Sequence, residues 1–215
     1  MNSAGGGRDH GRRTPPPRDQ GESAFAPILA AFVARVRGAL AAVLVDAEGE
    51  AVDYAGVLDP FAARLAGAHW RIVLNDAMAE KSDGALWLAV GTDHRSYIAR
   101  ALPDGYALVV VLTRSAAFVR WDRAVQVCVA GLGAEAGWTG MRQPDWFAVR
   151  VTSHPDGRPL AVRLNDRLRA VEILGVVANG LGPKERGWRV RLTTGAETTL
   201  VREVWGTWYA DEPLA

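Results

Sequence analysis

The chain has 215 residues, of which 49% are hydrophobic and 23% are charged, and its formal net charge is +1 at pH 7. This composition excludes wholesale disorder, and the length accommodates one domain of ordinary size and a smaller one. A net charge so close to zero gives no field that would hold nucleic acid or an anionic membrane across the whole molecule, so we expect neither as a partner.

The patterns of cysteine, histidine and apolar residues narrow further which classes of protein this sequence can belong to. Cys128 is the only cysteine, which excludes an internal disulfide and a cysteine-based metal cluster and fits a reducing compartment. The four histidines show no paired spacing on a helix, and no run of 18 apolar residues occurs. We therefore expect a cytoplasmic protein without a metal, a cofactor or a membrane-spanning helix.

Residues 1–22 are predicted to form a disordered tail. They are mostly Gly, Arg, Pro and Asp, so burial cannot offset the entropy lost on ordering them. The run Pro15-Pro16-Pro17 could serve as a polyproline ligand, but a stiff, solvated leader is the simpler interpretation. We expect the tail to be dispensable for folding.

Residues 23–138 alternate between helical and strand-like patterns. A helical period from Phe25 to Val36 predicts a first helix, Asp59-Pro60 starts a second, and Ser115 can cap a third. Strand-like runs bounded by turn residues lie between them, at 41–45, 51–55, 85–90, 96–102 and 106–112. Three helices and five strands in this order predict an α/β sandwich.

The stretch from Gly38 to Gly56, GALAAVLVDAEGEAVDYAG, is the predicted hairpin. A helix precedes it, and a helix, a three-strand meander and a third helix follow. This order resembles the roadblock/dynein light-chain family over roughly residues 24–138. The resemblance implies a roadblock-like dimeric scaffold of the bacterial GTPase-regulator type. It also implies a non-enzymatic adaptor or regulator that binds a small Ras-like GTPase.

In the family that this chain resembles, the second helix and a neighbouring strand meet their counterparts in another subunit, which implies a homodimer. The first and third helices are expected to shield one sheet face. The second helix is then not needed for the core of the chain itself. Its apolar row is therefore expected at the dimer interface and consists of Leu65, Ala68, Ile72 and Val73. Small residues nearby are expected to permit close helix approach, namely Ala62, Ala63, Ala66 and Gly67.

Arg64 and Arg71 lie seven residues apart on the second helix and hence share a face. One interpretation of this pair is a solvated flank. The other is contact with an acidic partner surface, because arginine forms forked hydrogen bonds to carboxylates and is favoured at interfaces. We assign both arginines to the surface that binds the GTPase, without a catalytic role.

No segment carries a catalytic or nucleotide-binding motif. Thr92-Asp93-His94-Arg95-Ser96 brings Ser, His and Asp together, but the composition of a hairpin turn explains all three. Neither a P-loop nor a GxGxxG segment between strand and helix is present, so the chain is not expected to bind nucleotide itself. Cys128 lies among valines and is expected to be an inert core thiol.

Residues 139–145 are predicted to be a linker, and residues 146–215 a small all-β, barrel-like domain. Its strand-like runs are 146–151, 160–164, 168–177, 188–192 and 198–205. The tryptophans of this domain could fill its core, or they could form a recognition surface with neighbouring arginines. That surface would consist of Trp188, Arg189, Arg191 and Trp205. In this alternative function the β domain recognises nucleic acid or a peptide, and the front domain only dimerises.

Overall fold

The computed structural model describes residues 16–80, 87–114, 116, 122–139, 145–178, 181–182, 184–204 and 206–214. Its front unit has the helices α1 (Ala26–Arg35), α2 (Pro60–Glu80) and α3 (Asp122–Ala136). The strands are β1 (Ala39–Val45), β2 (Ala51–Gly56), β3 (Trp87–Gly91), β4 (Arg95–Ala101) and β5 (Ala107–Thr113), with the short turn η1 (Pro103–Gly105) before β5. They form one antiparallel sheet in the order β2-β1-β5-β4-β3. The predicted α/β sandwich is confirmed.

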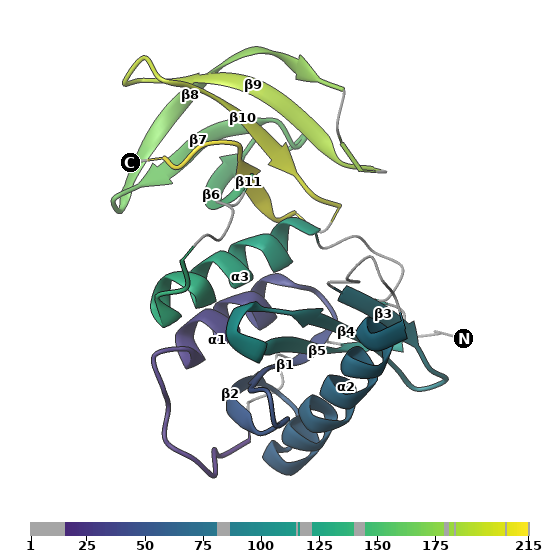
Figure 1. The fold of residues 1–215 in the computed structure, drawn as a ribbon. Coiled ribbons are helices and arrows are strands. Elements are labelled where there is room, and N and C mark those ends of the chain that lie inside the picture. The colour runs from purple at the N-terminus through teal and green to yellow at the C-terminus, as the bar shows by residue number, and fades with distance from the viewer. Residues whose placement is uncertain are drawn as a thin grey trace, which may run out of the picture.

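Helices cover both faces of this sheet (Figure 1). α1 and α3 pack on the face that presents Ala42 and Leu44 of β1, and α2 packs on the face that presents Val43 and Val45. Successive strand residues point to opposite faces, so a strand covered on both sides is apolar throughout. The expectation that the core of the chain does not need α2 is wrong, because its buried residues Ala63, Trp70 and Leu74 form a second core with the sheet.

Gly67 lies where α2 comes closest to β1. A Cβ atom at Gly67 would stand 2.8 Å from Cγ1 of Val45 and 3.0 Å from Cγ1 of Val43. Gly67 and the buried Ala63 therefore permit close approach to the chain's own sheet. This corrects the prediction that these two small residues face a second helix.

The C-terminal unit is a closed barrel in the strand order β10-β11-β6-β7-β8-β9. Its strands are β6 (Phe147–Ser153), β7 (Pro159–Leu164), β8 (Arg167–Val177), β9 (Arg186–Leu192), β10 (Glu197–Arg202) and β11 (Trp208–Ala210). The predicted barrel is confirmed, with six strands where the sequence indicated five. The missed strand, β11, has only three residues, and it closes the barrel by pairing with β10 and β6.

The barrel sits on the α1/α3 side of the front unit (Figure 1). Tyr209 of β11 is fully buried and belongs to the same core cluster as α1 and α3. The guanidinium of Arg35 lies over its ring, 5.8 Å from the centroid. Residues 140–144 of the predicted linker lie outside the described residues.

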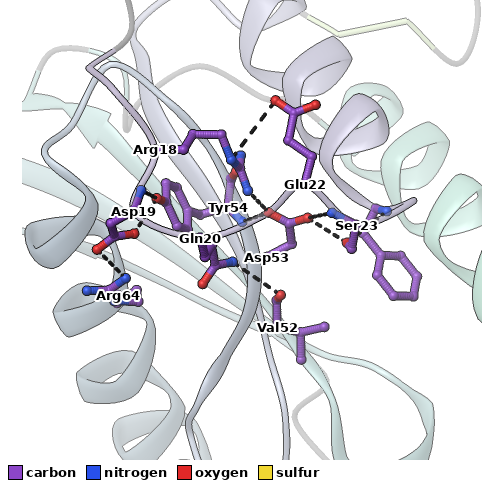
Figure 2. A network of polar contacts seen from close by, with 10 residues as sticks. Arg18, Asp19, Gln20, Glu22, Ser23, Val52, Asp53, Tyr54 and Arg64 are labelled. Carbon is purple, nitrogen blue, oxygen red and sulfur yellow. Dashed lines mark hydrogen bonds and ion pairs between the residues drawn. The ribbon is translucent and has the colours of Figure 1, made fainter.

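Residues 16–22 lie along β2, beside the start of α1 (Figure 2). Arg18 Nη1 donates to the carbonyl oxygen of Tyr54 at 2.5 Å, and Gln20 Nε2 donates to that of Val52 at 3.4 Å. The tail predicted for residues 1–22 therefore has the wrong boundary, because its last seven residues are docked on the fold. Residues 1–15 lie outside the described part of the chain.

Candidate interaction surfaces

Three large apolar side chains project from the outer face of α2. Asp59 starts this helix as predicted, since its Oδ1 accepts hydrogen bonds from the backbone N–H groups of Phe61 and Ala62 at 3.0 and 3.2 Å. Phe61, Leu65 and Ile72 are 66%, 57% and 60% exposed. Their spacing of four and seven residues places them on one face. We call Phe61, Leu65 and Ile72 the outer row.

The outer row contains two of the four predicted interface residues and one that the sequence reasoning missed. Leu65 and Ile72 are exposed, as an interface requires of a single subunit. Ala68 is half-buried, and Val73 is half-buried against the core between α2 and the sheet. Phe61 was not assigned to the interface, although it lies four residues before Leu65 and so continues the same helical period.

The two edges of the sheet differ in how they are covered. β2 is flanked by residues 16–22, as described above. β3, at the other edge, pairs only with β4 among the described residues. Trp87 at the start of β3 is exposed, and Leu88 and Val90 pack against the same core cluster as the buried face of α2. The open edge strand therefore belongs to the sheet that α2 covers, and Trp87, which alternates with Leu88 and Val90, points to the other face of that sheet.

Asp53 anchors the docked N-terminal segment (Figure 2). Its carboxylate is fully buried, pairs with Arg18, and accepts hydrogen bonds from the backbone N–H and the hydroxyl of Ser23 at 2.8 and 2.5 Å. Burial raises the pKa of this carboxyl, but hydrogen bonds from Ser23, Arg18 and the backbone N–H of Tyr54 outweigh burial and leave the pKa below its usual value. Asp53 is therefore held ionised in the folded chain.

Arg64 is joined to the same network. Its Nη1 lies 2.6 Å from Oδ2 of Asp19, and Oδ1 of Asp19 accepts a hydrogen bond from the Tyr54 hydroxyl at 2.7 Å. The Arg64 side chain remains 35% exposed. The N-terminal segment thus reaches from β2 to the flank of α2 and holds a predicted partner-binding arginine.

Arg71 lies in a different environment from Arg64. It is only 8% exposed, its Nε donates to the carbonyl oxygen of Asp46 at 3.2 Å, and its Nη2 donates to that of Gly105 at 2.8 Å. Nη1 bonds to the side-chain oxygen of Asn75. The expectation that both arginines share an exposed face is wrong, because the β1–β2 turn and η1 cover Arg71. Arg71 ties two loops to α2.

The barrel residues predicted to form a recognition surface do not gather on one. Trp188 is buried, with its ring 5.3 Å from that of Trp208, so the core interpretation holds for it. Arg189 and Arg191 are neutralised within the barrel by Glu197, Asp211 and Glu172. Trp205 lies outside the described residues. Recognition by these two arginines stays a prediction.

The candidate catalytic and metal residues are not assembled into a site. Ser96 is buried, and its hydroxyl donates to the carbonyl oxygen of Arg114 at 3.3 Å, whereas Asp93 and His94 are exposed in the turn. Burial raises the pKa of the Cys128 thiol to about 12, which suits a core thiol. Within the described ranges, His, Cys, Asp and Glu form no group of three that could hold a metal ion. No helix among these residues is long and apolar enough to cross a membrane.

Comparison with known proteins matches the front half of the chain. No protein-family model matches, and no curated protein does. A roadblock/LC7 domain from Streptomyces avermitilis is 18% identical over 53% of this chain and 96% of its own, with a TM-score of 0.43. Myxococcus xanthus MglB is 13% identical (53% and 94% coverage, TM-score 0.43), and Myxococcus xanthus MglC is 22% identical (51% and 96%, TM-score 0.37).

The first match is itself a roadblock/LC7 domain, which confirms the resemblance predicted for residues 24–138. The matched portion is about half of the chain, and the C-terminal barrel is not matched. At these identities and TM-scores the similarity concerns the arrangement of helices and strands. No partner and no residue role is carried over from these proteins to this chain.

Proposed function

We propose that this chain is a homodimeric, non-enzymatic adaptor of the cytoplasm in which two copies pack their α2 helices together. The dimer would bind a small Ras-like GTPase. The observation that supports dimerisation best is the outer row of α2. Single exposed apolar residues are ordinary on protein surfaces, but three large ones at helical spacing form a contiguous patch that is suited to an interface.

The energetics favour burial of this row. Covering a large apolar side chain contributes about 1.5–3 kcal/mol, and a two-fold interface buries each side chain twice, once in each subunit. The edge strand β3 offers backbone groups that no described residue pairs, and its exposed Trp87 lies on the sheet face opposite α2. Edge strands of this kind are templates for pairing with another chain. We therefore include β3 with the outer row in the proposed interface.

The GTPase partner is inferred from the sequence resemblance to the roadblock/dynein light-chain family. The chain has no phosphate-binding loop of its own, so the nucleotide would belong to the partner. Of the two arginines assigned to this contact, Arg64 is placed to take part because it is part-exposed at the edge of α2. Arg71 is buried and is left out of the proposed surface.

Sedimentation equilibrium of the full chain tests the dimer. Leu65→Glu places a charge in the proposed interface, and an unpaired buried charge costs several kcal/mol, so we expect the variant to sediment as a folded monomer. Val176→Glu is the matched control, because Val176 is 79% exposed on the barrel. A wild-type monomer, or a dimer that survives Leu65→Glu, would show that the interface is misplaced.

The partner is tested separately with the immobilised dimer and extract of the source cells. The extract is loaded with either GDP or a non-hydrolysable GTP analogue. We expect a Ras-like GTPase to be retained with one nucleotide and not the other, and Arg64→Glu to reduce its retention without dissociating the dimer. If retention of the GTPase depends neither on the nucleotide nor on Arg64, the GTPase proposal is contradicted. The dimer proposal is not affected by that result.

A further inference from the structure

The side chains of four arginines at one end of the barrel have no partner among the described residues. They lie on β6, on β7, and at the start of β8, and they are Arg150, Arg163, Arg167 and Arg169. None of them makes a hydrogen bond or an ion pair with any described residue, and all four are exposed. We call this group the basic end of the barrel.

The sheet register brings two of these charges face to face. Arg150 and Arg163 are directly opposite each other in the antiparallel β6–β7 pair. Opposed residues have Cβ atoms about 4.5–5.5 Å apart, and like charges in such a pair are destabilising. The fold therefore tolerates a repulsive pair here, and no described residue neutralises it, so an anion from another molecule would be a favourable partner.

Two neighbouring hollows lie at the basic end. One has a volume of about 560 Å³ and is lined by Arg150, Arg163 and residues of the β7–β8 turn. The other has a volume of about 320 Å³ and is lined by Arg167 and Arg169. Leu164 and Asn165 line both, so the two hollows adjoin at the β7–β8 turn. Arg167 and Arg169 are opposite Leu164 and Val162, so they lie on the other strand face from Arg163, and the two hollows present the arginines in two pairs. Among all these lining residues, Asp166 is the single carboxylate.

Three arginines elsewhere on the barrel, Arg158, Arg189 and Arg191, are neutralised by carboxylates, and Arg186 donates to the backbone carbonyl oxygen of Asp156 at 3.2 Å. Arg158 pairs with Asp156 at 2.6 Å, and Arg191 lies 2.9 and 3.0 Å from oxygens of Glu197 and Glu172. These four arginines thus have acceptors within the barrel, whereas the four side chains of the basic end have none among the described residues.

We propose that the basic end is a docking surface for an acidic segment of another protein. The planar guanidinium group of arginine forms forked hydrogen bonds to carboxylates, and Asp166 is the one carboxylate that lines the hollows. An apolar contact is also available, because the exposed Leu168 lies opposite Arg163 on the adjacent strand and Leu214 lines the larger hollow. The surface suits an extended peptide in which carboxylates alternate with apolar side chains.

Nucleic acid fits this surface less well. Proteins that hold single strands combine positive charge with exposed aromatic rings on which bases stack. In the described part of the barrel, Trp188, Trp208 and Tyr209 are buried. This proposal concerns a surface remote from α2 and does not depend on dimerisation or on the GTPase.

Fluorescence anisotropy with the full chain tests the proposal. The probe is a labelled peptide of glutamates with interspersed leucines, compared with its glutamine counterpart and with an oligodeoxythymidylate, in about 150 mM salt. We expect the glutamate peptide to bind and the other two to bind at least about ten-fold more weakly. Arg163→Glu should weaken binding of the glutamate peptide by about ten-fold or more, because it removes one charge partner and repels another.

The melting temperature shows whether Arg163→Glu loses peptide binding because of its charge or because it misfolds. Arg163→Glu converts the repulsive Arg150–Arg163 pair into an attractive one, so its melting temperature should equal or exceed that of the wild type. The control is Arg114→Glu with Lys184→Glu, which reverses two exposed, unpaired charges outside the hollows. It should keep wild-type affinity. No binding of the glutamate peptide, equal loss in the control, or tighter binding of the oligonucleotide would overturn the proposal.

Discussion

Arg123 of α3 and Glu185, just before β9, form an ion pair that joins the front unit to the barrel. Nη1 of Arg123 lies 2.5 Å from Oε1 of Glu185, and the two side chains are only 11% and 8% exposed. The guanidinium also lies 4.4 Å from the centre of the Trp146 ring, and Oε2 of Glu185 accepts the backbone N–H of Gly182 at 2.6 Å. Both charges are therefore held by further contacts, so the pair fixes how the two units meet.

Removing one member of the Arg123–Glu185 pair should lower the stability of the chain. A buried ion pair that loses one member leaves an uncompensated charge, so we expect Arg123→Ala to lower the free energy of unfolding by about 3 kcal/mol or more. Urea denaturation measures this. Arg158→Ala, which removes a pair whose side chains are half-exposed, should cost less than about 1 kcal/mol. If both variants lose the same stability, the Arg123–Glu185 pair does not secure the two units.

Asp53 predicts a pH-dependent contribution of the N-terminal segment to stability. The pKa of its carboxyl is lowered in the folded state, so its contribution is fully present above the unfolded value of about 3.9 and is lost as the pH falls through the folded value. Asp53→Asn should cost about 1–3 kcal/mol at neutral pH. The difference in free energy of unfolding between wild type and Asp53→Asn should shrink as the pH falls below about 4.

Urea midpoints at a series of pH values test this expectation. Asp93→Asn serves as the control, because Asp93 is exposed in the β3–β4 turn. Arg18→Ala should reproduce part of the Asp53→Asn loss, since it removes one donor to the same carboxylate. A stability difference between wild type and Asp53→Asn that is constant across the acidic range would contradict the assignment.

Local periodicity was sufficient to predict the helices and every strand except the three-residue β11, and long-range contacts account for the rest of what was missed. The Asp59 cap, the hairpin and the alternation of helix and strand depend on neighbours in sequence. The Arg18–Asp53 and Arg123–Glu185 pairs join residues that are 35 and 62 positions apart in the sequence, and no rule of local spacing predicts such pairs. The outer row was partly predictable because exposure follows helical period, whereas the burial of Arg71 depends on two loops from elsewhere.

Because Gly67 contacts β1, we expect a Gly→Ala substitution there to lower stability, whereas the same substitution usually stabilises a helix. Ala normally stabilises a helix interior by about 1 kcal/mol relative to Gly. At Gly67 the added methyl group would meet the side chains of Val43 and Val45, so we expect Gly67→Ala to destabilise the chain by about 1–3 kcal/mol. Thermal denaturation measures the change. Gly175→Ala, with nothing within 4 Å of the new Cβ, should show no such loss.

Arg64 and Arg71 should respond differently to the same substitution. Methionine keeps an apolar stem and removes the donors, so Arg71→Met leaves the carbonyl oxygens of Asp46 and Gly105 without their arginine partner. Hydrogen bonds from a charged group contribute about 1.5–3 kcal/mol each, and we expect a loss of at least about 2 kcal/mol in urea denaturation. Arg64→Met removes a part-exposed ion pair with Asp19 and should cost less than about 1 kcal/mol. Equal losses would mean that Arg71 does not fasten the two loops to α2.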